Sequence, residues 1–208
     1  MMRASTARIG IVCLILVTLL GCFSGRVRRP SSAPSVPHGR MVIVEFADHP
    51  PYSGTGMRFS RVLKEKISES TDQTDVVIVD PGDIAMRRSD RTLQRGRIAL
   101  KTLEITRRRF GGDTLLIGEI THYDPYSGPS VGIHLKAFST ANAEMLESLS
   151  ERWNSASPAL RKPIRRYYQR NRARDECRFG PNMFLTSPRY FLLFVADQIV
   201  RDHLLPAS

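Results

Sequence analysis

The sequence has few cysteines, few acidic residues for its basic content and no apolar run long enough to cross a membrane. Its three cysteines in 208 residues are too few for a disulfide scaffold. The nearly continuous apolar run at residues 9–20 is too short to span a bilayer core of about 30 Å as a helix. With 41% apolar and 25% charged residues, the chain is also not collagen-like, wholly disordered or a multi-span membrane protein. One globular domain with tails fits what remains.

Acidic residues are outnumbered by basic ones. The 31 lysines and arginines stand against 20 aspartates and glutamates, which gives a net charge of +11. Such an excess favours an anionic partner or an anionic surface, although it carries no information about the fold.

Strong motifs for catalysis and for metal binding are missing from the sequence. It contains no HExxH, no SxxK and no phosphate-binding loop. The spacing G-x-S-x-G occurs once, at residues 128–132, but a predicted strand follows it and not the helix of a nucleophile elbow. No two histidines have the i, i+4 spacing of a metal pair on a helix; they are His38, His49, His122, His134 and His203. We therefore predict a protein that is not an enzyme and that carries no metal and no cofactor.

The first 22 residues have the pattern of an export signal. Two arginines and no acidic residue precede the apolar run. The run ends in Leu19-Leu20-Gly21-Cys22, which resembles the lipobox of bacterial lipoproteins. The resemblance implies a signal peptide at residues 1–21 and acyl chains on Cys22; the alternative is an ordinary signal peptide followed by a cysteine without that role. Loss of the leader, with its two arginines, would lower the net charge from +11 to +9.

The rest of the chain divides into a tether and a domain. Residues 22–40 contain prolines, serines and four arginines but almost no large apolar residue, so we expect a lipidated N-terminus and an extended tether. Residues 41–205 form a single predicted domain. Its one cysteine, Cys177, is expected to keep a thiol, because the only other cysteine of the mature chain is the lipidated one.

Residues 41–110 predict a strand–helix–strand–helix unit. Short, continuous apolar runs at residues 41–46 and 76–79 are typical of strands that are covered on both faces. Residues 57–70 predict an amphipathic helix. A longer helix is expected at residues 90–110, ended by a glycine pair, with inward-facing residues Leu93, Leu100, Leu103 and Phe110.

The second half of the chain predicts a hairpin, a further strand and two helices. Strands at residues 114–121 and 131–137 should pair antiparallel, the second with one exposed face. Residues 144–153 fit a strand or a helix, and we favour a strand that closes a meander. Ser157-Pro158 starts a helix that Pro163 should kink or break, and a second Ser-Pro pair starts the last helix. The order β-α-β-α-β-β-(β)-α-α predicts an α/β fold, with helices packed on a mixed sheet of four to five strands.

The layout and one run of residues resemble a group of exported bacterial α/β lipoproteins. In the run, residues 108–121, a helix ends in a glycine turn and enters a strand of the form D-x-L-L-x-G-x-V; residues 131–138 match the group's next strand. The group includes the periplasmic domain of curli-secretion-channel proteins, the lipoprotein activators of penicillin-binding proteins and the N-terminal domain of the Tol-Pal propeller protein. The resemblance implies binding to other envelope proteins rather than catalysis. The long amphipathic hairpins that a secretion channel needs are missing from the sequence.

A basic cluster with interleaved tyrosines follows the predicted sheet. Such clusters bind anions through charge and stacking, and the candidates are Arg161, Lys162, Arg165, Arg166, Tyr167, Tyr168, Arg170, Arg172 and Arg174. Export argues against nucleic acid as the partner and favours anionic lipid, lipopolysaccharide, peptidoglycan or an acidic protein. The alternative is a solvated helix face. The loop residues Tyr123 and Tyr126 are a second candidate contact.

Together these patterns predict a non-enzymatic, lipid-anchored protein that faces the periplasm and binds another envelope component through its α/β domain. Phe23 follows Cys22 in place of the aspartate that retains enterobacterial lipoproteins on the inner membrane, which by resemblance favours the outer membrane. One alternative is an exported hydrolase or nucleotide-binding enzyme that uses His49 or the Gly54–Gly56 loop, with Asp80 as the acid on a ribose. Another is an oligomeric scaffold component of an envelope secretion or assembly complex.

Overall fold

The computed structural model describes residues 39–72, 74–86, 98–126, 128–174 and 177–205 of the 208-residue chain. All of them lie in one compact unit, Ala33–Ser208. The expected leader, Cys22 and the expected tether up to residue 38 lie outside the described residues. Within the described ranges, no helix is both long and apolar enough to cross a bilayer.

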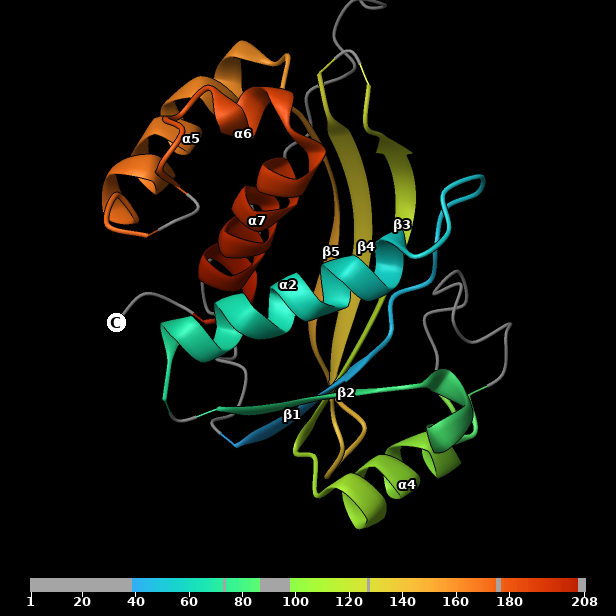
Figure 1. Ribbon diagram of the computed structural model, residues 1–208. Helices are drawn as coiled ribbons and strands as arrows, with labels where there is room; N and C mark the ends of the chain where they lie inside the picture. The colour runs from blue at the N-terminus through green and yellow to red at the C-terminus, as the bar shows by residue number, and fades with distance from the viewer. Residues whose placement is uncertain (1–38, 73, 87–97, 127, 175–176, 206–208) are drawn as a thin grey trace, which may run out of the picture. The chain divides into compact units, whose positions relative to one another are not determined.

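A five-stranded mixed sheet forms the centre of the described residues (Figure 1), as the sequence predicts. In spatial order its strands are β2 (Asp75–Val79), β1 (Arg40–Val44), β3 (Thr114–Asp124), β4 (Ser130–Ser139) and β5 (Met145–Asn154). β1 pairs in parallel with both β2 and β3, whereas β3, β4 and β5 form an antiparallel meander. The strand that we favoured for residues 144–153 is therefore confirmed as β5.

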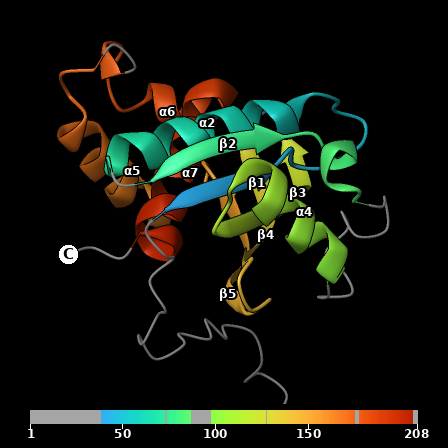
Figure 2. The ribbon, with the colours of Figure 1, turned by 90° about the horizontal axis from the view of Figure 1, so that it is seen from below.

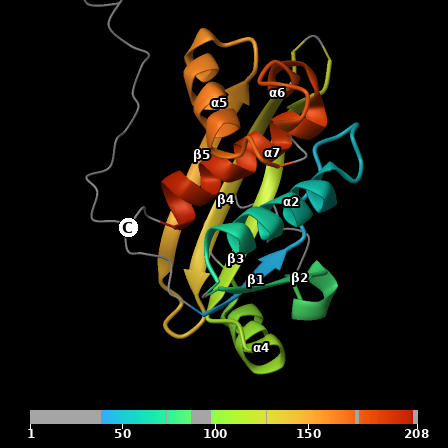
Figure 3. The same cartoon turned by 60° about the vertical axis from the view of Figure 1, so that its left-hand side comes forward.

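Helices lie on both faces of this sheet, which gives three layers (Figures 2 and 3). One face carries most of them: α2 (Thr55–Ser70), α5 (Pro158–Arg170), α6 (Met183–Thr186) and α7 (Pro188–Ile199), the last continued by a π turn at Val200–Leu204. The other face carries α4 (Leu100–Phe110) and a short 3-10 turn at Pro81–Ile84. In Figures 1 and 3, α7 lies between α2 and α5, so α5 is the outermost helix of its layer.

Apolar stripes in the sequence account for the packing. Phe59, Leu63 and Ile67 of α2 recur every fourth residue, and all three side chains are fully buried under the helical layer. The alternating residues of β1 point to opposite faces, where each joins a separate apolar cluster. The ring of Phe46 lies against Gly118, where a Cβ atom would come within 2.1 Å of that ring. Only glycine therefore fits at this position of β3.

Three local expectations are wrong. Leu100 does not face inward but is 73% exposed, because it is the first residue of α4 and the two residues before it are not helical. The rest of the expected helix start, including Leu93, lies outside the described residues. Pro163 neither breaks nor restarts α5, because the helix runs from Pro158 through Pro163 to Arg170; the packing of its buried residues Ile164 and Tyr167 offsets the cost of an interior proline. β4 has no exposed face, because Phe138 and Lys136 are buried on the side opposite its apolar stripe.

Candidate functional site

The basic cluster lies on α5, and the local sequence explains how that helix is held. Pro158 occupies the first helical position after Ser157, and the helix ends at Arg170, with Asn171 as its cap. Ile164 and Tyr167 point into the core and are 1% and 0% exposed. The opposite side of α5 carries Arg161, Lys162, Arg165 and Arg166, all exposed, which together are called the cationic face.

No acidic side chain pairs with the cationic face within the part of the chain that the structure describes. Positive side chains instead follow one another at i, i+4, as Arg161 with Arg165 and Lys162 with Arg166. Each such pair destabilises a helix by about 0.2–0.5 kcal/mol. The first turn of α5 also lacks an acidic residue that would favour its N-terminus. Packing of the inward face therefore holds a helix whose outward face repels itself, and an anion over that face would relieve the repulsion.

Two of the predicted anion-binding arginines have acidic partners in neighbouring elements. Nη2 of Arg170 lies 3.0 Å from Oδ2 of Asp197 on α7. Arg174 donates to Glu69 at the end of α2. These arginines join the helices of one layer, so they are less available to an outside anion than the cationic face. Arg172 is exposed and lies just beyond the helix.

The buried tyrosine of the cluster has a structural role. Tyr167 is 0% exposed, and its ring packs edge-on against Phe184 and Phe194 at centroid distances of 5.2 and 6.0 Å. The ammonium group of Lys66 lies 5.6 Å from the centre of the same ring. Tyr167 therefore cannot stack on a partner, contrary to the prediction. Tyr168 is half-buried and packs against the core.

A half-buried charge network lies beneath this end of α5. Lys66 is only 2% exposed, and its Nζ lies 3.1 Å from Oε2 of Glu69, which Arg174 also contacts. Burial by itself raises the pKa of Glu69, but the hydrogen bonds from Arg174 and Lys66 outweigh it and leave that pKa below its ordinary value. The network places a charged lysine on the inward side of α2, where a hydrophobic pattern predicts apolar residues. Sequence periodicity alone could therefore not find this network.

The second predicted contact, the hairpin loop, keeps one exposed tyrosine. Tyr126 is 68% exposed. Tyr123 is 9% exposed and packs edge-on against Tyr52 at 5.3 Å between ring centroids, so it belongs to the core and not to a contact surface. Burial raises the pKa of Tyr123, which keeps its phenol neutral.

The Gly54–Gly56 loop already holds a carboxylate at the N-terminus of α2. Asp48 accepts hydrogen bonds from the backbone N–H groups of Gly54 and Gly56 at 2.7 and 2.6 Å. A phosphate at this helix end would compete with that carboxylate for the same donors. Asp80 likewise accepts from the N–H of Gly82 at 2.7 Å and caps a turn. The geometry thus gives the nucleotide-binding alternative no ready site at these residues.

Two histidines that are far apart in the sequence, His49 and His122, lie close together beside the β3–β4 hairpin. The rings of His49 and His122 lie 6.2 Å apart, and Nε2 of His122 lies 2.9 Å from both Ser130 Oγ and Arg152 Nη2. Burial, the positive charge of Arg152 and the nearby His49 lower the pKa of His122. Nε2 of neutral His122 can accept a hydrogen bond from Nη2 of Arg152. No group of three or more metal-ligating side chains occurs among the residues described here.

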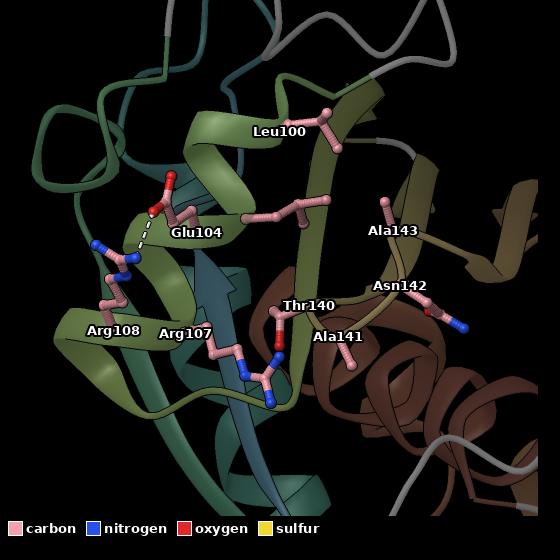
Figure 4. Close-up of a pocket in the computed structure, with 9 residues that line it drawn as sticks. Leu100, Glu104, Arg107, Arg108, Thr140, Ala141, Asn142 and Ala143 are labelled. Atoms are coloured by element: carbon pink, nitrogen blue, oxygen red, sulfur yellow. Dashed lines mark ion pairs between the residues drawn. The ribbon is translucent and has the colours of Figure 1, made fainter.

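An open groove of about 590 Å³ lies between α4 and the β4–β5 turn (Figure 4). Its walls include Leu100 and Leu103 on one side and residues 140–143 on the other. Arg108 and Glu104 form an exposed ion pair of 3.0 Å at its rim, which Figure 4 marks with a dashed line. Neither histidine nor cysteine is among its described lining residues. Of its polar lining groups, Glu104 is paired with Arg108, and the hydroxyl of Thr140 donates to the carbonyl oxygen of Gly112.

Comparisons with known proteins give likenesses in fold only. No protein-family model matches the chain, and no curated protein matches it. Among solved structures, the PelC dodecamer from Paraburkholderia phytofirmans is 16% identical, with a TM-score of 0.45 over 61% of this chain and 79% of that chain. The hypothetical protein CT253 from Chlamydia trachomatis is 10% identical, with a TM-score of 0.45 over 77% and 94%. Lipoprotein GNA1162 from Neisseria meningitidis is 15% identical, with a TM-score of 0.41 over 67% and 99%.

Proposed function

We propose that this chain is a lipid-anchored protein of the bacterial envelope that acts by binding an anionic envelope component and not by catalysis. The observation that carries the proposal is the position of Cys22, directly after an apolar run with two arginines before it and a small residue at Gly21. Acyl chains on this cysteine would hold the protein at a membrane, since each buried methylene contributes about 0.8 kcal/mol.

Binding through α5 is supported by charge. The cationic face presents four exposed positive side chains without acidic partners in the described part of the chain, whereas Arg170 and Arg174 on the same segment are paired. An enzyme would need a convergent set of reactive groups. Two of the three enzyme-like candidates already take part in local hydrogen bonds: the Gly54–Gly56 loop donates to Asp48, and Asp80 accepts from Gly82. The third, His49, lies beside His122, with 6.2 Å between the ring centroids. We place the protein at the outer membrane, facing the periplasm, because of Phe23 after the lipidated residue.

Incorporation of labelled palmitate tests the proposal. The intact protein and a Cys22→Ser variant are expressed in a bacterium that processes lipoproteins, and labelled membranes are then fractionated. We expect label in the intact protein only, and recovery of that protein with the outer membrane. Equal labelling of the two proteins, or no label in either, would contradict the anchor.

A further inference from the structure

The cationic face is an exposed patch and not a pocket. Its four residues lie within residues 161–166 of α5, over about 8 Å of the helix axis, and their side chains are all exposed. The groove of about 590 Å³ lies elsewhere, at α4 on the opposite face of the sheet. A patch of this kind matches a surface with many negative charges better than it matches one bound anion.

The composition of the face also distinguishes a membrane from a folded protein partner. Interfaces between folded proteins are anchored by aromatic residues and arginine around an apolar core from which other charged residues, lysine among them, are depleted. Arginines alone would therefore suit either partner, and the apolar core is what distinguishes a protein interface. Among the described residues that α5 exposes, none is large and apolar; besides the cationic face they include Gln169 and Ala159. Of the large apolar residues of the helix, Ile164 and Tyr167 are buried, and Leu160 and Tyr168 are half-buried against the core. Binding to anionic lipid headgroups requires positive charge and no exposed apolar anchor, which matches the cationic face.

We propose that the cationic face docks on the anionic phospholipid headgroups of the membrane that carries the chain's own acyl anchor. The inference rests on the proposed function for the anchor, which would keep headgroups at a high effective concentration around the domain. Each basic side chain close to an anionic bilayer strengthens binding by a factor of about five. The four residues of the cationic face together strengthen binding to the bilayer by roughly two orders of magnitude or more, and the anchor keeps the headgroups within their reach.

Vesicle binding by the non-acylated chain tests the inference independently of the anchor. The probe is the mature sequence, residues 22–208, with Cys22→Ser; it contains the whole compact unit Ala33–Ser208. Binding is measured by co-sedimentation with vesicles of phosphatidylcholine alone and of phosphatidylcholine mixed with phosphatidylglycerol. We expect binding to the mixed vesicles only, and loss of that binding at high salt, because salt screens exposed charges.

Two variants with the same change in net charge locate the contact. The first replaces the cationic face by glutamine, and the second replaces four exposed basic residues of other helices: Arg58, Arg61, Lys64 and Lys101. Thermal unfolding confirms that both are folded. We expect the first variant to lose affinity for the mixed vesicles by roughly two orders of magnitude and the second by less than tenfold.

Equal losses in the two variants would overturn the inference, because net charge and not α5 would then decide binding. So would binding to isolated peptidoglycan or to an acidic protein without binding to vesicles. If the first variant does not fold, the lipid and salt dependence of the unmodified probe still decides: salt-insensitive binding, or equal binding to both vesicle types, rejects it. If the probe binds the mixed vesicles but the intact protein incorporates no labelled palmitate, the anchor is refuted and the docking surface stands.

Discussion

The network of Lys66, Glu69 and Arg174 gives a quantitative prediction about how α2 is joined to the segment after α5. Glu69→Ala removes the carboxylate that lies 3.1 Å from Nζ of Lys66, an ammonium group that is only 2% exposed. Loss of one partner from a fully buried ion pair costs about 3–5 kcal/mol. Because the side chain of Glu69 is 28% exposed and water can replace part of the contact, we expect a smaller loss of about 2–3 kcal/mol in the free energy of unfolding.

Denaturant unfolding of the soluble chain measures this loss, which corresponds to a fall in Tm of about 4–12 °C. Glu65→Ala is the matched control, since Glu65 is an exposed residue of the same helix, and it should change stability by less than about 0.5 kcal/mol. Adding Lys66→Met to Glu69→Ala removes the buried charge as well and should restore part of the stability. A loss in Glu69→Ala no larger than that in Glu65→Ala would refute the reasoning. Because the pKa of folded Glu69 is lowered, its contribution is present at neutral pH and disappears as the pH falls through that pKa.

Two further predictions concern the sheet and its histidine pair. Gly118→Ala places a methyl group where a Cβ atom would lie 2.1 Å from the ring of Phe46, so it should destabilise the fold by about 1–3 kcal/mol in denaturant unfolding, and an unchanged midpoint would contradict this packing. The pKa of His122 is lowered, so the unfolded chain binds a proton more tightly and stability should fall as the pH drops below about 6.5. His122→Gln should reduce the loss between neutral and mildly acidic pH; the same loss in both proteins would show that His122 does not cause it.

Hydrophobic patterning predicts the element order and most of the core. The stripe of Phe59, Leu63 and Ile67 has the period of a helix, and the short continuous apolar runs have the length of buried strands. The helix and the two strands lie where these patterns predict them. Leu100 was misplaced because the pattern does not mark the first residue of α4, and a residue at a helix end can leave the core while its neighbour Leu103 stays in it.

The sequence predicts which residues make up the candidate site, but it does not predict which of them are exposed and which hold the helices together. The sequence shows a basic cluster, yet it does not show that Tyr167 is the residue that anchors the helix in the core. The pairing of Arg170 with Asp197 joins residues 27 positions apart and depends on how α5 and α7 pack, which periodicity does not encode. For the same reason the contact between His122 and Arg152, at 30 positions, could not be read from the sequence.

The mass of the N-terminal peptide, measured on protein isolated from membranes, tests the central claim most directly. The account predicts that the mature chain begins at Cys22 and that this residue carries a diacylglyceryl group. Recovery of the chain from the soluble cytosolic fraction, with Met1 and the residues up to Gly21 still attached, would contradict it.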